Sequence, residues 1–250
     1  MRKNSKTLTD FNVPIEAIQE EFYQICKPGT QYSDLCYIFN IALNDTTRFP
    51  QINSVTNYKE YIHRWVKGYY DAMNNLPSQR IAKPKSSCSD PAITAIVQYA
   101  TQVSSEDAEL QSHYHNLFMS AENIQGNLLE EYIAHCVREY GWLWCNGNVL
   151  RAIDFCTTNG SALLQIKNKS NTENSSSSAI REGTDIIKWY RLGTKIQNGT
   201  PYPSLKWEAL NQIINTYAVN HSPNCNMNED SYKTFIQKVT SANPNIITGR

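Results

Sequence analysis

No apolar run in the 250-residue sequence approaches the roughly 18 residues that a membrane-spanning helix needs. The first residues, Met1 to Lys6, lack the apolar stretch of a secretory signal peptide. Neither sign of charge is in excess, since Lys and Arg number 23 and Asp and Glu number 23. This balance excludes a globally basic nucleic-acid coat but allows a local basic groove. We therefore expect a cytoplasmic protein with no membrane partner.

The sequence also lacks the spacing patterns of several common sites. Its seven cysteines are odd in number, and no pair shows the C-x₂₋₄-C spacing of a zinc site, so we expect buried thiols. His113 and His115 stand two apart on a predicted helix and cannot share a face to bind a metal. The sequence contains no G-x-G-x-x-G and no Walker loop, so it gives no support for a nucleotide-driven motor.

Helical periodicity is present through the first 140 residues. Apolar spacings of three and four predict helices over 15–26, 58–73, 91–103, 104–118 and 121–140. Pro91 opens one of them, Ser104 or Ser105 caps the next, and Gly141 ends the last. These spacings predict a largely helical N-terminal region.

Strand-like runs follow. Asn146-Gly147 between 142–145 and 148–155 predicts a hairpin, and a turn at 157–160 leads into a third strand over 161–167. Residues 185–191 fit either a short helix or a strand, and helices are predicted over 204–217, capped by Ser204, and 229–240. We expect an α/β (α+β-like) fold, with residues 1–118 as a mainly helical region and 119–250 as the core that contains the sheet.

Asp154, Gln165 and Lys167 carry the chemistry that this core suggests. Gln165 and Lys167 share one face of a strand because strand side chains alternate, and the turn brings the Asp154 strand alongside. Asp154 and the Gln165 carbonyl can bind Mg²⁺, and Lys167 can stabilise negative charge on a phosphorane-like transition state. The alternative is that Asp154 and Lys167 merely end strands and pair with each other.

The preceding helix supplies further carboxylates. Glu122, Gly126 and Glu130 follow one another at intervals of four along one edge of the apolar stripe, which can face the Asp154 cluster. Gly126 costs about 1 kcal/mol of helix stability against Ala, which suggests close approach of another backbone. Glu131 points to the other side and is expected to be solvated. The alternative is an ordinary exposed helix edge.

The order of a helical Glu, a strand Asp and a strand Gln-x-Lys resembles the PD-(D/E)xK nuclease superfamily. A closer resemblance, to the SinI-type restriction endonucleases, covers roughly residues 113–192. It rests on Ala121-Glu-Asn123, Leu128-Leu-Glu130, Gly141-Trp-Leu-Trp-Cys145, Ile153-Asp-Phe155, Leu164-Gln-Ile-Lys-Asn168, Asn171-Thr-Glu-Asn-Ser-Ser-Ser-Ser178 and Ile180-Arg181.

This resemblance implies a core with a mixed sheet flanked by helices and Mg²⁺-dependent cleavage of double-stranded DNA at a short palindrome-like site, GG(A/T)CC for the SinI type. Carried over by motif, Asp154 is the main metal ligand and Gln165 replaces the usual acid. Lys167 is the superfamily lysine, and Glu130 or Glu122 is the helical carboxylate. A homodimer matches a two-fold site, and a cognate methyltransferase is expected in the host. Residues 1–118 would then support DNA binding or dimerisation, and residues 119–250 would form the nuclease core.

The polar loop over 168–184 is the expected DNA contact. Residues 160 to 206 contain seven basic side chains and three acidic ones, and this local excess of positive charge suits a phosphate backbone. Amide, hydroxyl and guanidinium groups can read bases or hold phosphates, and the candidates are Asn168, Lys169, Asn171, Asn174, Ser175, Ser176, Ser177 and Arg181. The alternative is a flexible polar linker. Two other functions remain open, a Holliday-junction or structure-selective nuclease and a DNA-binding protein with an inactive core.

Overall fold

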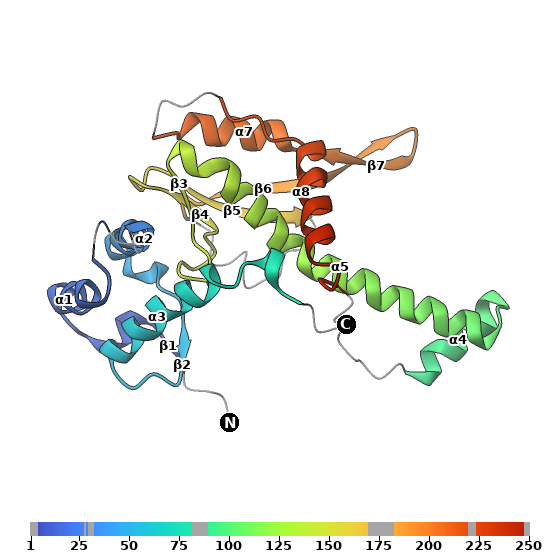
Figure 1. Cartoon of the computed structure of the whole chain (residues 1–250), viewed down its shortest axis with the longest axis horizontal. Helices are drawn as coiled ribbons and strands as arrows, with labels where there is room; N and C mark the ends of the chain where they lie inside the picture. Colours follow the sequence, from blue (N-terminus) through green and yellow to red (C-terminus); the bar gives the residue numbers. More distant parts are fainter. Residues whose placement is uncertain are drawn as a thin grey trace. The chain divides into compact units, whose positions relative to one another are not determined.

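The computed structural model describes residues 5–27, 29, 33–81, 90–169, 183–219 and 224–247. By its internal contacts the chain forms two compact units (Figure 1). The first contains Met1–Asn75 and Tyr132–Ser231, and the second contains Leu76–Glu131 and Tyr232–Arg250. The predicted division into 1–118 and 119–250 is based on function rather than on contacts, and it stays a prediction.

The N-terminal part of the first unit is helical, as predicted. Its elements are β1 (Ser5–Lys6), η1 (Leu8–Phe11), α1 (Ile15–Ile25), α2 (Ser33–Asn44), η2 (Thr46–Arg48), β2 (Ile52–Asn53) and α3 (Tyr58–Met73). Periodicity located α1 and α3, whose apolar faces are narrow. It missed α2, because six of its twelve residues are buried and leave no single apolar stripe. Phe22 stacks on Phe39 with ring centroids 3.8 Å apart, and Trp65 packs against both.

A mixed sheet forms the rest of this unit. Its described strands are β3 (Trp142–Trp144), β4 (Phe155–Thr157), β5 (Leu163–Lys169), β6 (Ile187–Gln197) and β7 (Thr200–Leu205), hydrogen-bonded in that order. Only β5 and β6 are parallel. Residues 185–191, left open as helix or strand, thus lead into β6. The expected mixed sheet flanked by helices is confirmed.

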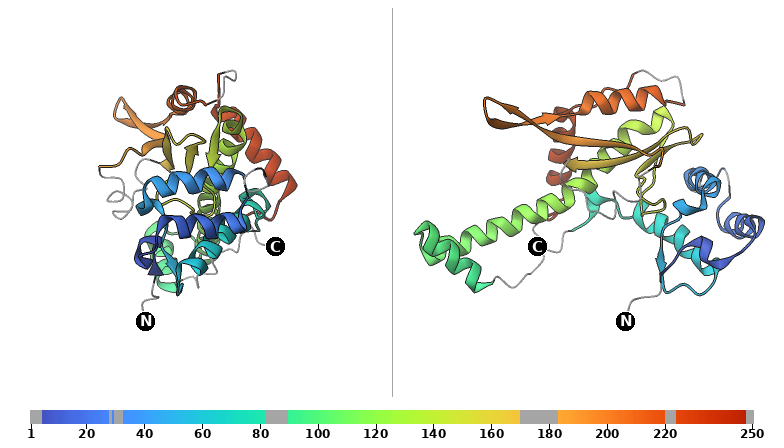
Figure 2. Two further views of the ribbon diagram at one scale, coloured as in Figure 1. Left: turned by 90° about the vertical axis from the view of Figure 1, so that its left-hand side faces the viewer. Right: turned by 180° about the vertical axis from the view of Figure 1, so that it is seen from behind.

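Helices cover this sheet, and β6 and β7 extend as a hairpin past the shorter strands (Figure 2). Trp207 and Leu210 of α7 (Trp207–Thr216) are buried, as is Trp189 of β6. Ser204 was expected to cap this helix, but it lies in β7, and the N-cap residue, Lys206, has no side-chain capping bond. The prolines and exposed residues of β7 hid this strand from periodicity.

The segment between β3 and β4 contradicts the predicted hairpin. Instead of a second strand over 148–155, the chain turns into the helical core, where Val149 and Leu150 are 1% exposed. Asn148 and Ala152, both within the predicted strand, have φ values of 57° and 58°, which regular strand residues do not adopt. A Cβ at Gly147 would lie 2.7 Å from the carbonyl oxygen of Gly68. Close packing against α3 therefore decided the conformation that the Asn-Gly pair adopts here.

The second unit is helical. Its elements are η3 (Pro77–Gln79), α4 (Pro91–Thr101), most of α5 (Ser105–Val137) and most of α8 (Glu229–Ala242), and Leu128, Val239 and Ile246 form its buried cluster. We predicted separate helices over 104–118 and 121–140, but α5 is continuous. Ser120 does not start a helix, because its hydroxyl donates to the carbonyl of Asn116 in the preceding turn (3.0 Å). Ser104 does cap α5, since its hydroxyl oxygen accepts from the Asp107 N–H.

Among the described residues, no helix has both the length and the apolarity needed to span a membrane. The six described cysteines are thiols, and five of them are buried, Cys136 being the partly exposed one.

The short turn η4 (Arg138–Tyr140) follows α5 and ends at Gly141, whose φ is 80°. This left-handed conformation is the one expected of a glycine at the C-terminal end of a helix.

Candidate active site

Asp154 lies directly before β4 and is fixed to the neighbouring strand by two hydrogen bonds. Its backbone N–H donates to the carbonyl of Leu164 (2.9 Å), and its Oδ2 accepts from the backbone N–H of Ile166 (2.7 Å). Ile166 stands between Gln165 and Lys167. The structure therefore brings the carboxylate of Asp154 to the strand segment that carries the other two predicted residues.

Gln165 and Lys167 project from the same face of β5 because side chains alternate along a strand. Gln165 is 4% exposed, and within the described part of the chain its Oε1 has no hydrogen-bond partner. A buried amide oxygen without a donor costs about 1–3 kcal/mol. Lys167, two residues further, is partly exposed and directs an ammonium group along the same face. The face thus combines one carboxylate, one amide oxygen in need of a ligand, and one cation.

These oxygen atoms fit a hard cation such as Mg²⁺. Mg²⁺ binds through one or two protein oxygens and keeps several waters, so it does not need an all-protein cage. The described residues include no cluster of three or more His, Cys, Asp or Glu side chains that could bind a metal by themselves. Asp154 with the Gln165 amide oxygen is a different donor set, and the unpartnered buried Oε1 is the observation that makes it suitable.

The helical carboxylates belong to a separate part of the chain. Glu122 is exposed and Glu130 is partly buried, and both lie on the portion of α5 within the second unit. Asp154 belongs to the first unit, so the approach of either glutamate to it stays a prediction. Gly126 has open space where a Cβ would point, which contradicts the expected close approach of another backbone.

Glu131 is buried rather than solvated, and this expectation was wrong. Glu131 is only 2% exposed. Its carboxylate accepts hydrogen bonds from the backbone N–H of Ser78 (2.8 Å) and from the Ser78 hydroxyl (2.5 Å). Ser78 lies in η3, where backbone N–H groups lack helical partners. Glu131 therefore satisfies donors of the second unit and has a structural role.

The opposite face of β5 and β6 carries a buried polar network that sequence reasoning missed. Arg191 is 6% exposed and donates through Nη1 to both oxygens of Glu229 (2.7 and 2.8 Å). Its Nε donates to Oδ1 of Asn168 (2.9 Å), the residue after Lys167. Trp207 also donates to Glu229. The sequence does contain a signal for this network, because Arg191 continues the alternation of Ile187 and Trp189 and so places a charge on an apolar strand face.

The predicted DNA-contacting residues divide into two groups. Asn168 and Lys169 are described, and Asn168 directs its amide oxygen to Arg191, on the face away from Lys167. Lys169 ends β5 and is partly exposed. The others lie outside the described residues, namely Asn171, Asn174, Ser175, Ser176, Ser177 and Arg181. Trp189 of β6 is 3% exposed and packs on Trp207.

Comparison with known proteins extends these observations over most of the chain. A model of the SinI restriction endonuclease family matches residues 36–242. Type II restriction enzyme Eco47I of Escherichia coli is 30% identical over 194 residues, which cover 76% of this chain and 76% of that protein. Type II restriction enzyme SinI of Salmonella infantis is 28% identical over 208 residues, which cover 80% of this chain and 84% of that protein. The matched span includes Asp154, Gln165 and Lys167.

Proposed function

Because the chain belongs to the SinI restriction endonuclease family, we propose that it cuts double-stranded DNA in a Mg²⁺-dependent reaction at a short palindrome-like site. The observation that carries the proposal is the position of the Asp154 carboxylate. Its Oδ2 accepts from the backbone N–H of Ile166, the residue between Lys167 and Gln165, whose Oε1 has no partner among the described residues. This arrangement offers a cation site and a fixed positive charge side by side.

Each of the three residues has a role in hydrolysis. Asp154 and the Gln165 amide oxygen would hold the Mg²⁺, which supplies charge neutralisation at the scissile phosphate when bound. Lys167 positions the attacking water and stabilises the negative charge that develops on the phosphate oxygens. Water adds to phosphorus, the bond to the 3′ oxygen breaks, and the products are a 3′-hydroxyl and a 5′-phosphate.

A second carboxylate is expected from α5, since Gln165 stands where the superfamily usually has an acid. Glu130, which is partly buried, is the first candidate, and Glu122, which is exposed, is the second. Either would supply the charge that an amide lacks and orient a metal-bound water. The proposal therefore includes a helical glutamate in the site but does not depend on which of the two it is.

Specificity is proposed from the resemblance to the SinI type. The site would be GG(A/T)CC, read in part by the 168–184 loop, with Asn168 and Lys169 at its start. A homodimer would match the two-fold symmetry of such a site. A cytoplasmic enzyme of this kind acts where the host DNA lies, so we propose that a cognate methyltransferase protects that DNA.

Digestion of plasmid and phage DNA tests the proposal. Purified protein is incubated with DNA in Mg²⁺ and, separately, in EDTA, and the fragment ends are mapped. We expect discrete fragments in Mg²⁺ alone, with ends at GG(A/T)CC. The absence of cleavage on every linear duplex would refute the proposal, and cleavage of branched DNA only would favour a junction nuclease. DNA binding without any cutting would indicate an inactive core, the alternative that Gln165 motivates.

A further inference from the structure

A cavity of about 560 Å³ lies in the first unit, and Asp154 is not among the residues that line it. Its lining includes Asp45, Thr47, Arg48, Arg151 and Asp185. These residues come from the turn after α2, from the loop before β4 and from the approach to β6. None of them has a role in the proposed catalytic site, so the two arginines need another explanation.

The two acidic residues of the cavity differ in how firmly they are bound. Oδ1 of Asp45 accepts from the Thr47 N–H (3.1 Å) and hydroxyl (2.6 Å), and Oδ2 pairs with Arg48 Nε (3.3 Å). The hydrogen bond from the Thr47 hydroxyl is the main reason why the pKa of Asp45 lies below its usual value. Asp185 is 77% exposed in its side chain and lies 3.7 Å from Arg48 Nη2. An ion pair this exposed contributes little to stability and is readily exchanged for another partner.

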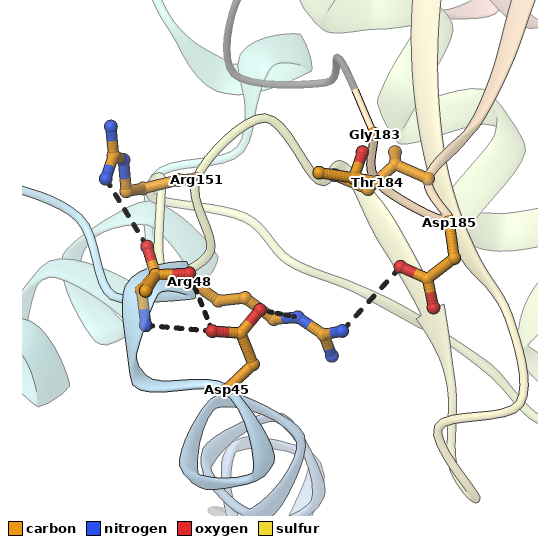
Figure 3. A pocket seen from close by; sticks show the side chains of 8 residues that line it. Asp45, Arg48, Arg151, Gly183, Thr184 and Asp185 are labelled. Carbon is orange, nitrogen blue, oxygen red and sulfur yellow. Dashed lines mark hydrogen bonds and ion pairs between the residues drawn. The ribbon is translucent and has the colours of Figure 1, made fainter.

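Arg151 keeps most of its hydrogen-bonding capacity. Its backbone N–H donates to the carbonyl of Arg48 (2.8 Å), which fixes the main chain. Its guanidinium makes one long hydrogen bond, to the carbonyl of Thr47 (3.4 Å), and within the described residues it pairs with no carboxylate. Figure 3 shows the Arg48 side chain between Asp45 and Asp185, whereas the Arg151 guanidinium extends away from both. A guanidinium has five N–H donors, so Arg151 can still bind an anion through two of them.

Ile186, which lines the cavity, directly precedes β6 and lies beside Leu163 of β5 in the strand register, on the face that carries Lys167. Leu163 of β5 and Ile186, which lines the cavity, both pack on the core formed by α1 to α3. Lys167 lies four residues after Leu163 on that face, and Ile187 pairs with Leu164. Four strand residues span about 13 Å. That distance corresponds to roughly four nucleotides of rise along one DNA strand.

We propose that Arg151 and Arg48 bind a backbone phosphate of the DNA duplex about four nucleotides from the phosphate at Lys167. This inference rests on the proposed function, because it assumes that the scissile phosphate lies at Lys167. The phosphate replaces Asp185 as the partner of Arg48, and it provides the second charge that Arg151 lacks. The contact fixes the position of the duplex and carries no base information.

The test measures how tightly a GG(A/T)CC duplex binds in EDTA at several salt concentrations. We expect Arg151→Ala to weaken binding about tenfold, as for one charge-assisted contact. The slope of log K against log salt should fall by about 0.9 in magnitude. Asp185→Asn should act in the opposite direction and tighten binding. Arg64→Ala, which removes an exposed arginine of α3 paired with Glu60, is the matched control and should change neither quantity.

A neutral methylphosphonate placed at single positions locates the contact. Replacing a phosphate roughly three to five nucleotides from the cut should weaken wild-type binding but leave Arg151→Ala unaffected. Unchanged salt slopes for both Arg151→Ala and Asp185→Asn, in a wild-type protein that binds and cuts DNA, would overturn this inference alone. A wild-type protein that neither binds nor cuts DNA would overturn the proposed function instead. Circular dichroism of each variant verifies that it is folded.

Discussion

The carboxylate of Asp154 accepts a hydrogen bond of 2.7 Å from the backbone N–H of Ile166, the residue between Gln165 and Lys167. This bond ties the carboxylate to β5, so the position of the proposed metal ligand does not depend on a flexible side chain. Charge-assisted hydrogen bonds of this kind are roughly twice as strong as neutral ones. The site is therefore organised by backbone, and its chemistry can be changed one side chain at a time.

Gln165→Glu should retain cleavage and raise the apparent affinity for Mg²⁺. The substitution keeps the volume and adds a charged oxygen where the amide oxygen is buried without a donor. Titration of cleavage rate against Mg²⁺ concentration measures the change. Gln165→Leu, which keeps the burial and removes the oxygen, is the control and should lower Mg²⁺ affinity. Equal metal dependence in all three proteins would show that Gln165 does not face the metal.

Lys167→Ala should lower the single-turnover cleavage rate by roughly 10²–10³-fold, the usual effect of removing one stabilising group from a transition state. Binding in EDTA should change far less, because one partly exposed lysine contributes little to the total phosphate contact. Lys67→Ala removes an exposed lysine of α3 that pairs with Asp71 and serves as the control. A drop in binding as large as the drop in rate would contradict a role for Lys167 in the chemical step.

Arg191→Ala should lower the free energy of unfolding by about 3–5 kcal/mol, because it leaves the carboxylate of Glu229 without its buried cation. Chemical denaturation measures this loss. The exposed pair of Lys67 and Asp71 gives the comparison, since Lys67→Ala should cost less than about 1 kcal/mol. Similar losses from the two substitutions would show that the network of Arg191 is not a stabilising one.

Glu21→Gln should destabilise the protein by about 1–2 kcal/mol near pH 7, and the difference should vanish in acid. Burial raises the pKa of Glu21, but hydrogen bonds from Lys59 and His63 outweigh it, so the pKa lies below its usual value. A lowered pKa means that the contribution to stability is present above the unfolded value of about 4.3 and is lost as the pH falls through the folded value. Thermal unfolding of both proteins from pH 3 to pH 7 measures it, and a gap that widens in acid would refute this assignment.

Local patterns were sufficient to predict the elements whose chemistry is local. The spacing of apolar residues predicted α3 at its observed bounds, 58–73, and the alternation around Gln165 and Lys167 predicted a strand there. The same reasoning failed where packing between segments far apart in the sequence determines the backbone conformation. Gly147 turns against Gly68, which is far away in sequence, so the Asn-Gly pair does not form the expected tight hairpin.

The candidate site shows the same division. The relation of Asp154 to Gln165 and Lys167 follows from a short turn and could be predicted. The pairing of Arg191 with Glu229 could not, because it joins residues 38 positions apart through the fold of α7 and β7. Glu131 was misplaced for a related reason, since its partner Ser78 lies 53 residues earlier. Periodicity locates a face but not the donors that another segment brings to it.

The most direct test of the central claim is single-turnover cleavage by Asp154→Asn. The amide keeps an oxygen to accept from Ile166, so the fold and the position of β5 should be preserved while the charge of the metal ligand is lost. We predict that cleavage of a GG(A/T)CC duplex in Mg²⁺ disappears and that binding of the same duplex in EDTA is retained. Cleavage at the wild-type rate by this variant would contradict the assignment of Asp154 and, with it, the proposed site.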